Sequence, residues 1–477
     1  MAPMLLLLPE LVVLSGALLF FVASLSTAPK ARVLHLLALL CGLAVLISAC
    51  AAFRAEGVLF SGSYALNPFS QTFKILLAGA FCFVLIAGGR LASISKDIQA
   101  EYYLFLFLSV FGLMLLVSAE ELILIFVALE LSSFSLYLLV PMRDDHGGLR
   151  PQMEAGIKYL LFGVIATGFM LFGMSYLFAL TGSTSLPGII SAVHQGLPAP
   201  LALVAFVLIL CGFFFKLAVF PFHFWVPDIY QGAANETASF ISTLPKIAAV
   251  AILIRLMQVL PAGHEQFVVL SFAVLALSSM FYGNLCALVQ EDIKRLLGFS
   301  GIAHAGFILL ALLTLKEEGY ALAIYYISAY ALMNLACFMA ICAIARQGEN
   351  LCITDLHGLS REQPILAFIL ATGLFGLAGI PPFAGFMAKF LVLTEILDKG
   401  HLLVVILAAV NTAIAIYYYL LVVRAAYTVE TGGNSAKVIS PSLLTIAAGI
   451  TLVIAIILAG ILPAKFIALA TTVVQSL

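Results

Sequence analysis

The sequence predicts an all-α polytopic membrane protein with about fourteen transmembrane helices, and three observations support this fold class. Apolar residues make up 64% of the 477 residues and charged residues only 9%, which is more apolar surface than one soluble domain can bury. The apolar residues fall into runs of roughly 20, the length that crosses a bilayer. Part of the pattern also recurs within the chain, as it does in many transporters.

The fourteen apolar runs follow one another along almost the whole chain. In order they are near 4–26, 33–53, 70–89, 103–118, 121–140, 156–180, 201–220, 237–260, 267–289, 298–315, 320–345, 365–397, 402–426 and 441–468. The first run begins Met-Ala-Pro-Met, without a basic segment or a small-residue cleavage site. We therefore interpret it as a retained helix rather than a signal peptide.

The basic residues of the loops predict the orientation, because Lys and Arg are retained on the cytoplasmic side. With the N-terminus outside, twelve fall in cytoplasmic loops: Lys30, Arg32, Arg90, Lys96, Arg143, Arg150, Lys294, Arg295, Arg346, Arg361, Arg424 and Lys437. Only four fall outside: Arg54, Lys316, Lys399 and Lys465. Both termini are therefore predicted on the non-cytoplasmic side.

A weak internal duplication divides the chain. Segment 119–139 parallels 290–310, and LAVFPF at 217–222 parallels LAGIPP at 377–382. Five helices separate the two copies, and an odd number reverses the direction of a repeat across the membrane. We expect three N-terminal helices in 1–100, a first repeat of helices 4–8 in 101–262, an inverted second repeat of helices 9–13 in 263–430, and a last helix in 431–477.

Each repeat contains one helix that prolines should break. In 213–228, Pro221 and Pro227 follow Lys216, and in 376–390, Pro381 and Pro382 precede Lys389. Proline removes an intrahelical hydrogen bond and frees a carbonyl. Such breaks persist at membrane depth where they are buried in protein or line a wet cavity. An ordinary proline kink is the alternative, but its occurrence at equivalent positions in both repeats, each beside a lysine, favours function.

Six basic residues lie within the apolar runs: Lys74, Lys158, Lys216, Lys246, Arg255 and Lys389. A lysine at mid-membrane costs roughly 2.5–3.5 kcal/mol on insertion scales, so such residues usually serve ion or proton movement. Glu130 lies mid-helix and needs a cationic partner. For Lys74 and Arg255, near the external helix ends, we favour snorkelling to the surface over function.

Other polar residues leave two interpretations open. Lys158 is expected two or three residues inside its helix, where it either snorkels or functions. Lys246 follows Pro245 about one-third of the way along its helix, which favours function. His304, among small residues, is either a proton carrier or a hydrogen-bonded packing residue.

Several other chemistries find no support in the sequence. Neither GxGxxG nor GxxxxGK[ST] occurs, so no phosphate-binding loop is indicated. The eight cysteines form no CxxC pair, which gives no indication of a metal or iron–sulfur site. A net charge of −1 gives no electrostatic reason to expect nucleic acid.

Five motifs resemble a known family. EAGIKYLLFG, KLAVFPFHFWVPD, STLPKIA, DIKRLLGFSGIAHAGF and GIPPFAGFMAKF occur in this order and are similar to the antiporter-like membrane subunits of respiratory complex I (NADH–quinone oxidoreductase), across helices 4–13. The lysine of GFMAKF favours the subunit N branch over M, and the length argues against L. One departure is Asp228-Ile-Tyr-Gln231-Gly-Ala-Ala234, where relatives commonly read Asp-Val-Tyr-Glu-Gly-Ala-Pro. It puts the packing of this loop in doubt.

The resemblance implies two inverted five-helix units and one proton channel in the cell (inner) membrane, driven by a redox reaction on other subunits. It implies no cofactor on this chain, and NADH, FMN, iron–sulfur clusters and quinone on partner subunits of the membrane and hydrophilic arms. The family's key positions fall on Glu130, Lys158, Lys216, Lys246 and Lys389, with His304 and Lys294 as accessory members.

These positions suggest a mechanism as a hypothesis. Glu130 and Lys216 form a coupled pair, since a lysine beside a carboxylate is held in its charged form and a lysine alone in an apolar site is driven towards the neutral form. The proton then passes through Lys246 and His304 to Lys389 and the external side. The alternatives are a multisubunit cation/proton antiporter, a ferredoxin- or hydrogenase-linked ion pump, and a structural spacer whose lysines are replaceable.

Overall fold

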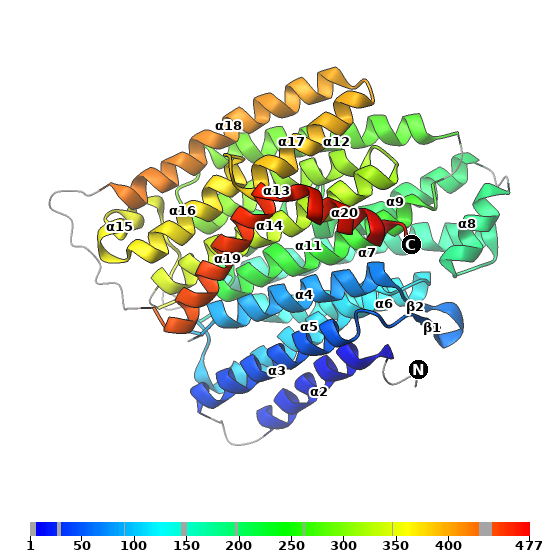
Figure 1. The fold of residues 1–477 in the computed structure, drawn as a ribbon. Coiled ribbons are helices and arrows are strands. Elements are labelled where there is room, and N and C mark those ends of the chain that lie inside the picture. The colour runs from blue at the N-terminus through cyan, green and yellow to red at the C-terminus, as the bar shows by residue number, and fades with distance from the viewer. Residues whose placement is uncertain are drawn as a thin grey trace.

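The computed structural model describes residues 6–25, 30–89, 91–144, 150–195, 199–260, 263–345, 347–428 and 441–477. These residues form a bundle of long helices that run roughly parallel to one another (Figure 1). Within the described ranges, twelve helices are long and apolar enough to cross a membrane. The all-α polytopic class is confirmed. Three of the basic residues that predict the orientation lie outside the described residues, namely Arg90, Arg346 and Lys437.

The first three long helices lie together on one side of the bundle, drawn in blue in Figure 1. They are α2 (Leu8–Ser24), α3 (Ala31–Ala51) and α4 (Pro68–Ala87). Between α3 and α4 the chain forms an unpredicted antiparallel hairpin of β1 (Gly57–Leu59) and β2 (Tyr64–Leu66). The Asn67 side chain accepts a hydrogen bond from the Ser70 backbone and so caps the start of α4, which fixes where the hairpin ends.

The next helices of the chain lead to the buried central helix of the bundle, α11 (Asn235–Met257). They are α5 (Gln99–Val117), α6 (Leu122–Leu139), α7 (Pro151–Thr181), α8 (Leu186–His194), α9 (Ala199–Leu217), α10 (Trp225–Gly232) and α11 (Asn235–Met257). Every residue of α11 is buried. The predicted break after Lys216 is present, because α9 ends at Leu217 and the chain is non-helical through Pro221 before α10 begins.

The remaining helices complete the bundle. They are α12 (Glu265–Ala287), α13 (Ile293–Leu312), α14 (Glu317–Ile344), α15 (Leu359–Glu362), α16 (Pro364–Ala378), α17 (Ala384–Asp398), α18 (Leu402–Tyr427), α19 (Leu443–Ile461) and α20 (Pro463–Val474). Short 3₁₀ helices lie at Phe60–Gly62, Lys96–Ile98, Val140–Met142 and Ile353–Leu356. The apolar run 365–397 is divided at Gly379, whose φ of 84° ends α16, in the left-handed conformation that glycine adopts most readily.

Equivalent contacts in the two halves support the predicted duplication. Leu122 donates a backbone hydrogen bond to Thr184, and Ile293 donates one to Leu351. Leu122 and Ile293 are 171 positions apart, the same offset as between the parallel segments 119–139 and 290–310. Gly112 approaches the α6 backbone closely, and Gly283, again 171 positions later, approaches the α13 backbone in the same way. Tracing the chain places the two backbone bridges at opposite ends of the bundle, as an inverted repeat requires.

The start of α2 and the end of the chain lie at the same end of the bundle (Figure 1). Glu10 of α2 forms an ion pair with Lys74 near the start of α4, and the Phe69 backbone donates to Ser476 Oγ at 3.1 Å. These contacts agree with the prediction that both termini face one side of the membrane.

Candidate functional site: a buried polar axis

Lys216 occupies the last turn of α9, immediately before the break. Its side chain is buried, and its Nζ has no hydrogen-bond partner among the described residues. Aromatic rings surround it instead, with Nζ 5.9 Å from the centre of Tyr137, 5.7 Å from Tyr159 and 5.6 Å from Phe215. A cavity of about 10 Å³ adjoins the side chain, close to the smallest volume that holds a water molecule.

Glu130 lies mid-way along α6, as predicted, and is half-buried. Its Oε1 accepts a hydrogen bond from Thr167 Oγ1 of α7 at 2.8 Å. Glu130 and Lys216 are close enough for their charges to interact. They nevertheless form no direct ion pair, because Lys216 Nζ has no hydrogen-bond partner within the described part of the chain. Tyr137 and Tyr159, whose rings face Lys216, also lie within electrostatic reach of Glu130.

Lys246 and His304 are brought together at the centre of the bundle. Lys246 Nζ donates to the Gly301 carbonyl at 3.3 Å and to Tyr330 Oη at 3.4 Å. The His304 ring lies 5.3 Å from the Tyr330 ring. Its Nδ1 is 2.8 Å from Tyr326 Oη, and its Nε2 is 3.2 Å from Tyr419 Oη. Three tyrosine hydroxyls, those of Tyr326, Tyr330 and Tyr419, therefore contact the two basic groups. A hydroxyl can both donate and accept a hydrogen bond, so these groups can relay a proton.

Lys389 is the buried lysine of the second broken helix. It lies in the first turns of α17 and is buried. Its Nζ donates to the carbonyls of Leu377 at 2.9 Å and Ala378 at 3.1 Å. These carbonyls end α16, where a helix lacks intrahelical donors and carries partial negative charge. Lys389 and His304 are close enough for their charges to interact, so the axis continues from the centre to α17.

Lys158 lies apart from this axis. It is the eighth residue of α7 rather than the second or third, because the helix begins already at Pro151. Its Nζ pairs with Glu154 and with Asp228, both at 2.7 Å, and the side chain remains 38% exposed. Asp228 also accepts a hydrogen bond from Arg295 at 2.8 Å. The short helix α10 that carries Asp228 is not one of the membrane-length helices.

The charges around Asp228 stabilise its ionised form. Partial burial raises the pKa of the Asp228 carboxyl, but hydrogen bonds from Lys158 and Arg295 outweigh burial and hold this pKa below its ordinary value.

Lys294 was predicted in a loop, but it lies in the first turn of α13, fully buried. Its Nζ donates to the Ala233 carbonyl at 2.7 Å. Lys294 therefore packs beneath the turn between α10 and α11.

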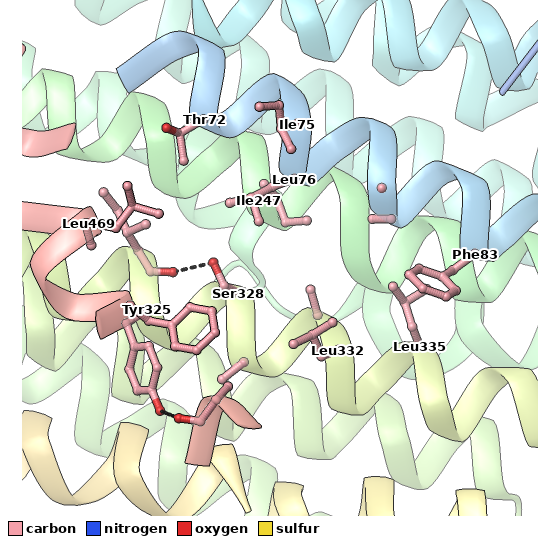
Figure 2. A pocket seen from close by; sticks show the side chains of 18 of the residues that line it. Thr72, Ile75, Leu76, Phe83, Ile247, Tyr325, Ser328, Leu332, Leu335 and Leu469 are labelled. Carbon is pink, nitrogen blue, oxygen red and sulfur yellow. Dashed lines mark hydrogen bonds between the residues drawn. The ribbon is translucent and has the colours of Figure 1, made fainter. Parts of the chain in front are cut away.

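A cavity of about 590 Å³ lies away from the axis, between α4, α14 and α20 (Figure 2). Its walls are almost entirely apolar and include Leu76, Leu335 and Leu469. None of the axis lysines lines it. Within the described ranges, no three His, Cys, Asp or Glu side chains gather in a way that could hold a metal ion.

Comparison with known proteins identifies the family. Residues 119–415 match the family described as NADH:quinone oxidoreductase/Mrp antiporter, TM. The chain is also 49% identical over 458 residues to NADH-quinone oxidoreductase subunit N 2 of Opitutus terrae, covering 96% of this chain and 95% of that one. The chain belongs to this family of membrane subunits. The resemblance deduced from the five motifs is confirmed.

Further members of the family agree with this assignment. Subunit N of Nitrosomonas europaea is 34% identical and covers 87% of this chain and 86% of its own length. A chain of respiratory complex I from Thermus thermophilus with bound aureothin superposes with a TM-score of 0.81 at 28% identity, covering 97% and 99% of the two chains. A chain of the Mrp complex from Dietzia has a TM-score of 0.85 at 20% identity, covering 99% and 96%, and shares the fold.

The interpretation of Lys74 and Arg255 as snorkelling residues was wrong for this family member. Lys74 is fully buried, pairs with Glu10 at 2.7 Å and donates to Tyr64 Oη at 3.1 Å. Arg255 is 2% exposed and pairs with Glu120. Depth along a helix does not reveal whether another helix covers the side chain, and here α2 and the loop before α6 supply carboxylates. Neither Glu10 nor Glu120 was considered from the sequence.

The buried Glu10–Lys74 pair leads to a prediction about stability. Lys74→Met is expected to destabilise the protein by about 3–5 kcal/mol, because it leaves the Glu10 carboxylate buried without its cation. The double variant Glu10→Gln/Lys74→Met should lose less than Lys74→Met alone. Thermal unfolding of the purified complex and the yield of assembled complex measure both effects. Equal stability of Lys74→Met and wild type would contradict a buried pair.

Proposed function

We propose that this chain is the subunit N of a redox-driven NADH:quinone oxidoreductase, a translocase, and carries one proton pathway. The observation that supports it best is the set of buried basic groups Lys216, Lys246, His304 and Lys389. The last three are linked by tyrosine hydroxyls and by electrostatic interaction with one another. Buried lysines in a membrane bundle are retained at a cost and mark ion or proton paths. Relatives named as subunit N support the choice of complex.

The proposed path begins at the Glu130–Lys216 pair and ends at Lys389. Lys216, whose Nζ has no hydrogen-bond partner in the part of the chain that the structure describes, is the group that exchanges a proton, and Glu130 influences its charge. Lys246 and His304 relay the proton, and Lys389 releases it towards the external side. Lys158 and Lys294 act as accessory charges near α10. Each charge moved against the membrane potential costs about 2.3 kcal/mol per 100 mV, which the redox reaction on partner subunits supplies.

Further parts of the proposal concern the setting of the chain. We place NADH, FMN, iron–sulfur clusters and quinone on partner subunits, with no redox centre on this chain. The protein spans the inner membrane many times, with both termini on the non-cytoplasmic side. The functional units are the helices of 1–100, the repeats 101–262 and 263–430, and the last helix in 431–477. The equivalent backbone bridges at opposite ends of the bundle support this division.

The experiment that tests the function is purification of the complex with this chain, followed by reconstitution into proteoliposomes. Co-purifying flavin and iron–sulfur subunits, with proton uptake driven by NADH and quinone, support the proposal. Exchange of Na⁺ or K⁺ for protons without quinone would instead support the antiporter alternative, whose fold the Mrp chain shares.

Lys246→Gln tests the relay within the same preparation. The variant is expected to lower quinone-coupled pumping by about tenfold or more, since positioned acid–base groups typically contribute 10²- to 10⁴-fold. Gln keeps a donor towards Gly301 and Tyr330 but carries no exchangeable charge. Proton uptake per NADH oxidised is the measurement. Unchanged pumping in an assembled variant would remove Lys246 from the path.

A further inference from the structure

A polar cavity opens at the end of the bundle where α11 begins. Its volume is about 390 Å³, and it lies between the ends of α3, α4, α14 and α19. Arg32 and Ser442, which line it, are exposed, whereas Glu236, which also lines it, is 5% exposed. The cavity therefore leads from the surface to a buried carboxylate at the start of the central helix.

Glu236 has the surroundings of a proton acceptor. Its Oε1 is buried without a hydrogen-bond partner among the described residues. Lys294 and Arg143 are close enough to interact with its charge. Both also donate hydrogen bonds to backbone carbonyls at the α10–α11 turn, and Arg143 donates to the Gly348 carbonyl as well. Tyr102, Tyr103 and Cys342 also lie within electrostatic reach. The carboxylate thus lies within electrostatic reach of two cations, lines the cavity, and has one oxygen without a hydrogen-bond partner among the described residues.

A polar stripe runs from Glu236 along the buried helix α11. Glu236, Ser239, Thr243 and Lys246 are spaced by three, four and three residues, which places them on one face of an α-helix. All four are buried. Ser239 Oγ has no hydrogen-bond partner among the described residues, and Thr243 Oγ1 accepts from Asn334 at 3.0 Å. Ten residues of helix cover about 15 Å, so the stripe reaches from the cavity floor to the centre of the axis.

We propose that this cavity is a second proton inlet, with Glu236 as the group that takes up a proton from water and the α11 stripe as its route to Lys246. The inference rests on the proposed function and adds to it a site of uptake separate from Glu130 and Lys216. Since α11 begins at the end of the bundle that we assign to the cytoplasm, the inlet supplies Lys246 directly from that side. Water molecules bridging the Ser and Thr hydroxyls would carry the proton along the stripe.

The first test is Glu236→Gln in the intact complex, reconstituted into proteoliposomes. Gln keeps the size of the side chain and its ability to accept a hydrogen bond at the start of α11, but it cannot bind and release a proton. Pumping per NADH oxidised is expected to fall by about tenfold, with normal assembly and thermal stability. A loss of stability with unchanged pumping would mean that Glu236 only caps the helix, and the inlet would be abandoned.

The second test blocks the cavity itself. In a background with Cys342→Ser and Cys352→Ser, Ser442→Cys is labelled with a negatively charged methanethiosulfonate reagent from the cytoplasmic side. The matched control is Thr428→Cys, which is exposed at the same end of the bundle but is not among the residues that line the cavity. Labelling should inhibit pumping in the Ser442→Cys variant and leave the control unchanged. Equal pumping in both labelled variants would overturn the proposal.

A comparison with Lys246→Gln distinguishes failure of the proposed inlet at Glu236 from failure of the proposed proton pathway. If Lys246→Gln loses pumping and Glu236→Gln does not, the inlet is wrong and the relay stands. If neither variant loses pumping, the proposed proton pathway itself fails.

Discussion

Lys389→Ala is expected to abolish most proton pumping, by about tenfold or more, while the complex still assembles. Lys389 is the buried lysine of α17, in the second half of the second broken helix. Its Nζ donates hydrogen bonds to the carbonyls of Leu377 and Ala378 at the end of α16. Lys389 is the last group of the proposed path, so its loss should interrupt the path at that point. Proton uptake and quinone reduction in reconstituted complex measure the loss.

Lys399→Ala provides the matched control for this prediction. Lys399 follows the end of the same helix and is partly exposed, with its Nζ 3.6 Å from Glu395 and its charge within reach of Lys316. A partly exposed pair of this kind contributes little, so pumping should remain near the wild-type rate. If both alanine variants behaved alike, the buried position of Lys389 would have no role in transport.

Glu130→Gln and Lys216→Met are each expected to remove most of the pumping, and their combination should be no worse than the more damaged single variant. The two charges interact without touching, with Tyr137 and Tyr159 in reach of both. Removing one charge leaves the other in an apolar site, at a cost of about 3–5 kcal/mol before it adjusts its protonation. Groups that act as one unit show non-additive effects.

A double-mutant cycle on pumping tests this coupling. The rates of wild type, both single variants and the double variant are compared in reconstituted complex, with assembly checked in each. Additive losses would show that Glu130 and Lys216 work independently, and the pair would no longer serve as the switching element. Thr167→Val offers a milder probe, because it removes the hydroxyl that contacts Glu130 and the Gly163 carbonyl of its own helix but leaves both charges in place.

The sequence was sufficient for the helices and for most of the axis. Each apolar run contains at least one helix within the described residues, because a chain in lipid must satisfy its own backbone hydrogen bonds. Lys216, Lys246 and Lys389 were found because a lysine in an apolar run has no other explanation than burial or snorkelling. Their direct contacts were not predictable: the carbonyls that hold Lys389 become acceptors only through the way α16 ends at Gly379.

The sequence was insufficient where a partner comes from a distant segment. Lys74 and Glu10 are 64 residues apart, and Arg255 and Glu120 are 135 apart, so the alternative of snorkelling appeared the simpler one. Glu236 gave no signal, because a carboxylate near the start of a helix is commonplace. A periodic count of polar residues on α11 would have found its stripe, since Glu236, Ser239, Thr243 and Lys246 share one helical face.

The two backbone bridges have a mechanical consequence. One ties the start of α6 to the segment before α8, and the other ties the start of α13 to the segment after α14, on opposite faces of the membrane. In each half, backbone hydrogen bonds thus connect the start of a helix to a loop segment that is distant in the sequence. These bonds oppose sliding of the helices past one another. The non-helical segments 218–224 and 379–383 are then the places where each half can bend. Each half therefore behaves as a rigid group of helices with one flexible point in its broken helix. In the proposed function, changes of charge at the buried side chains would then pass along the path while the surrounding helices stay almost stationary.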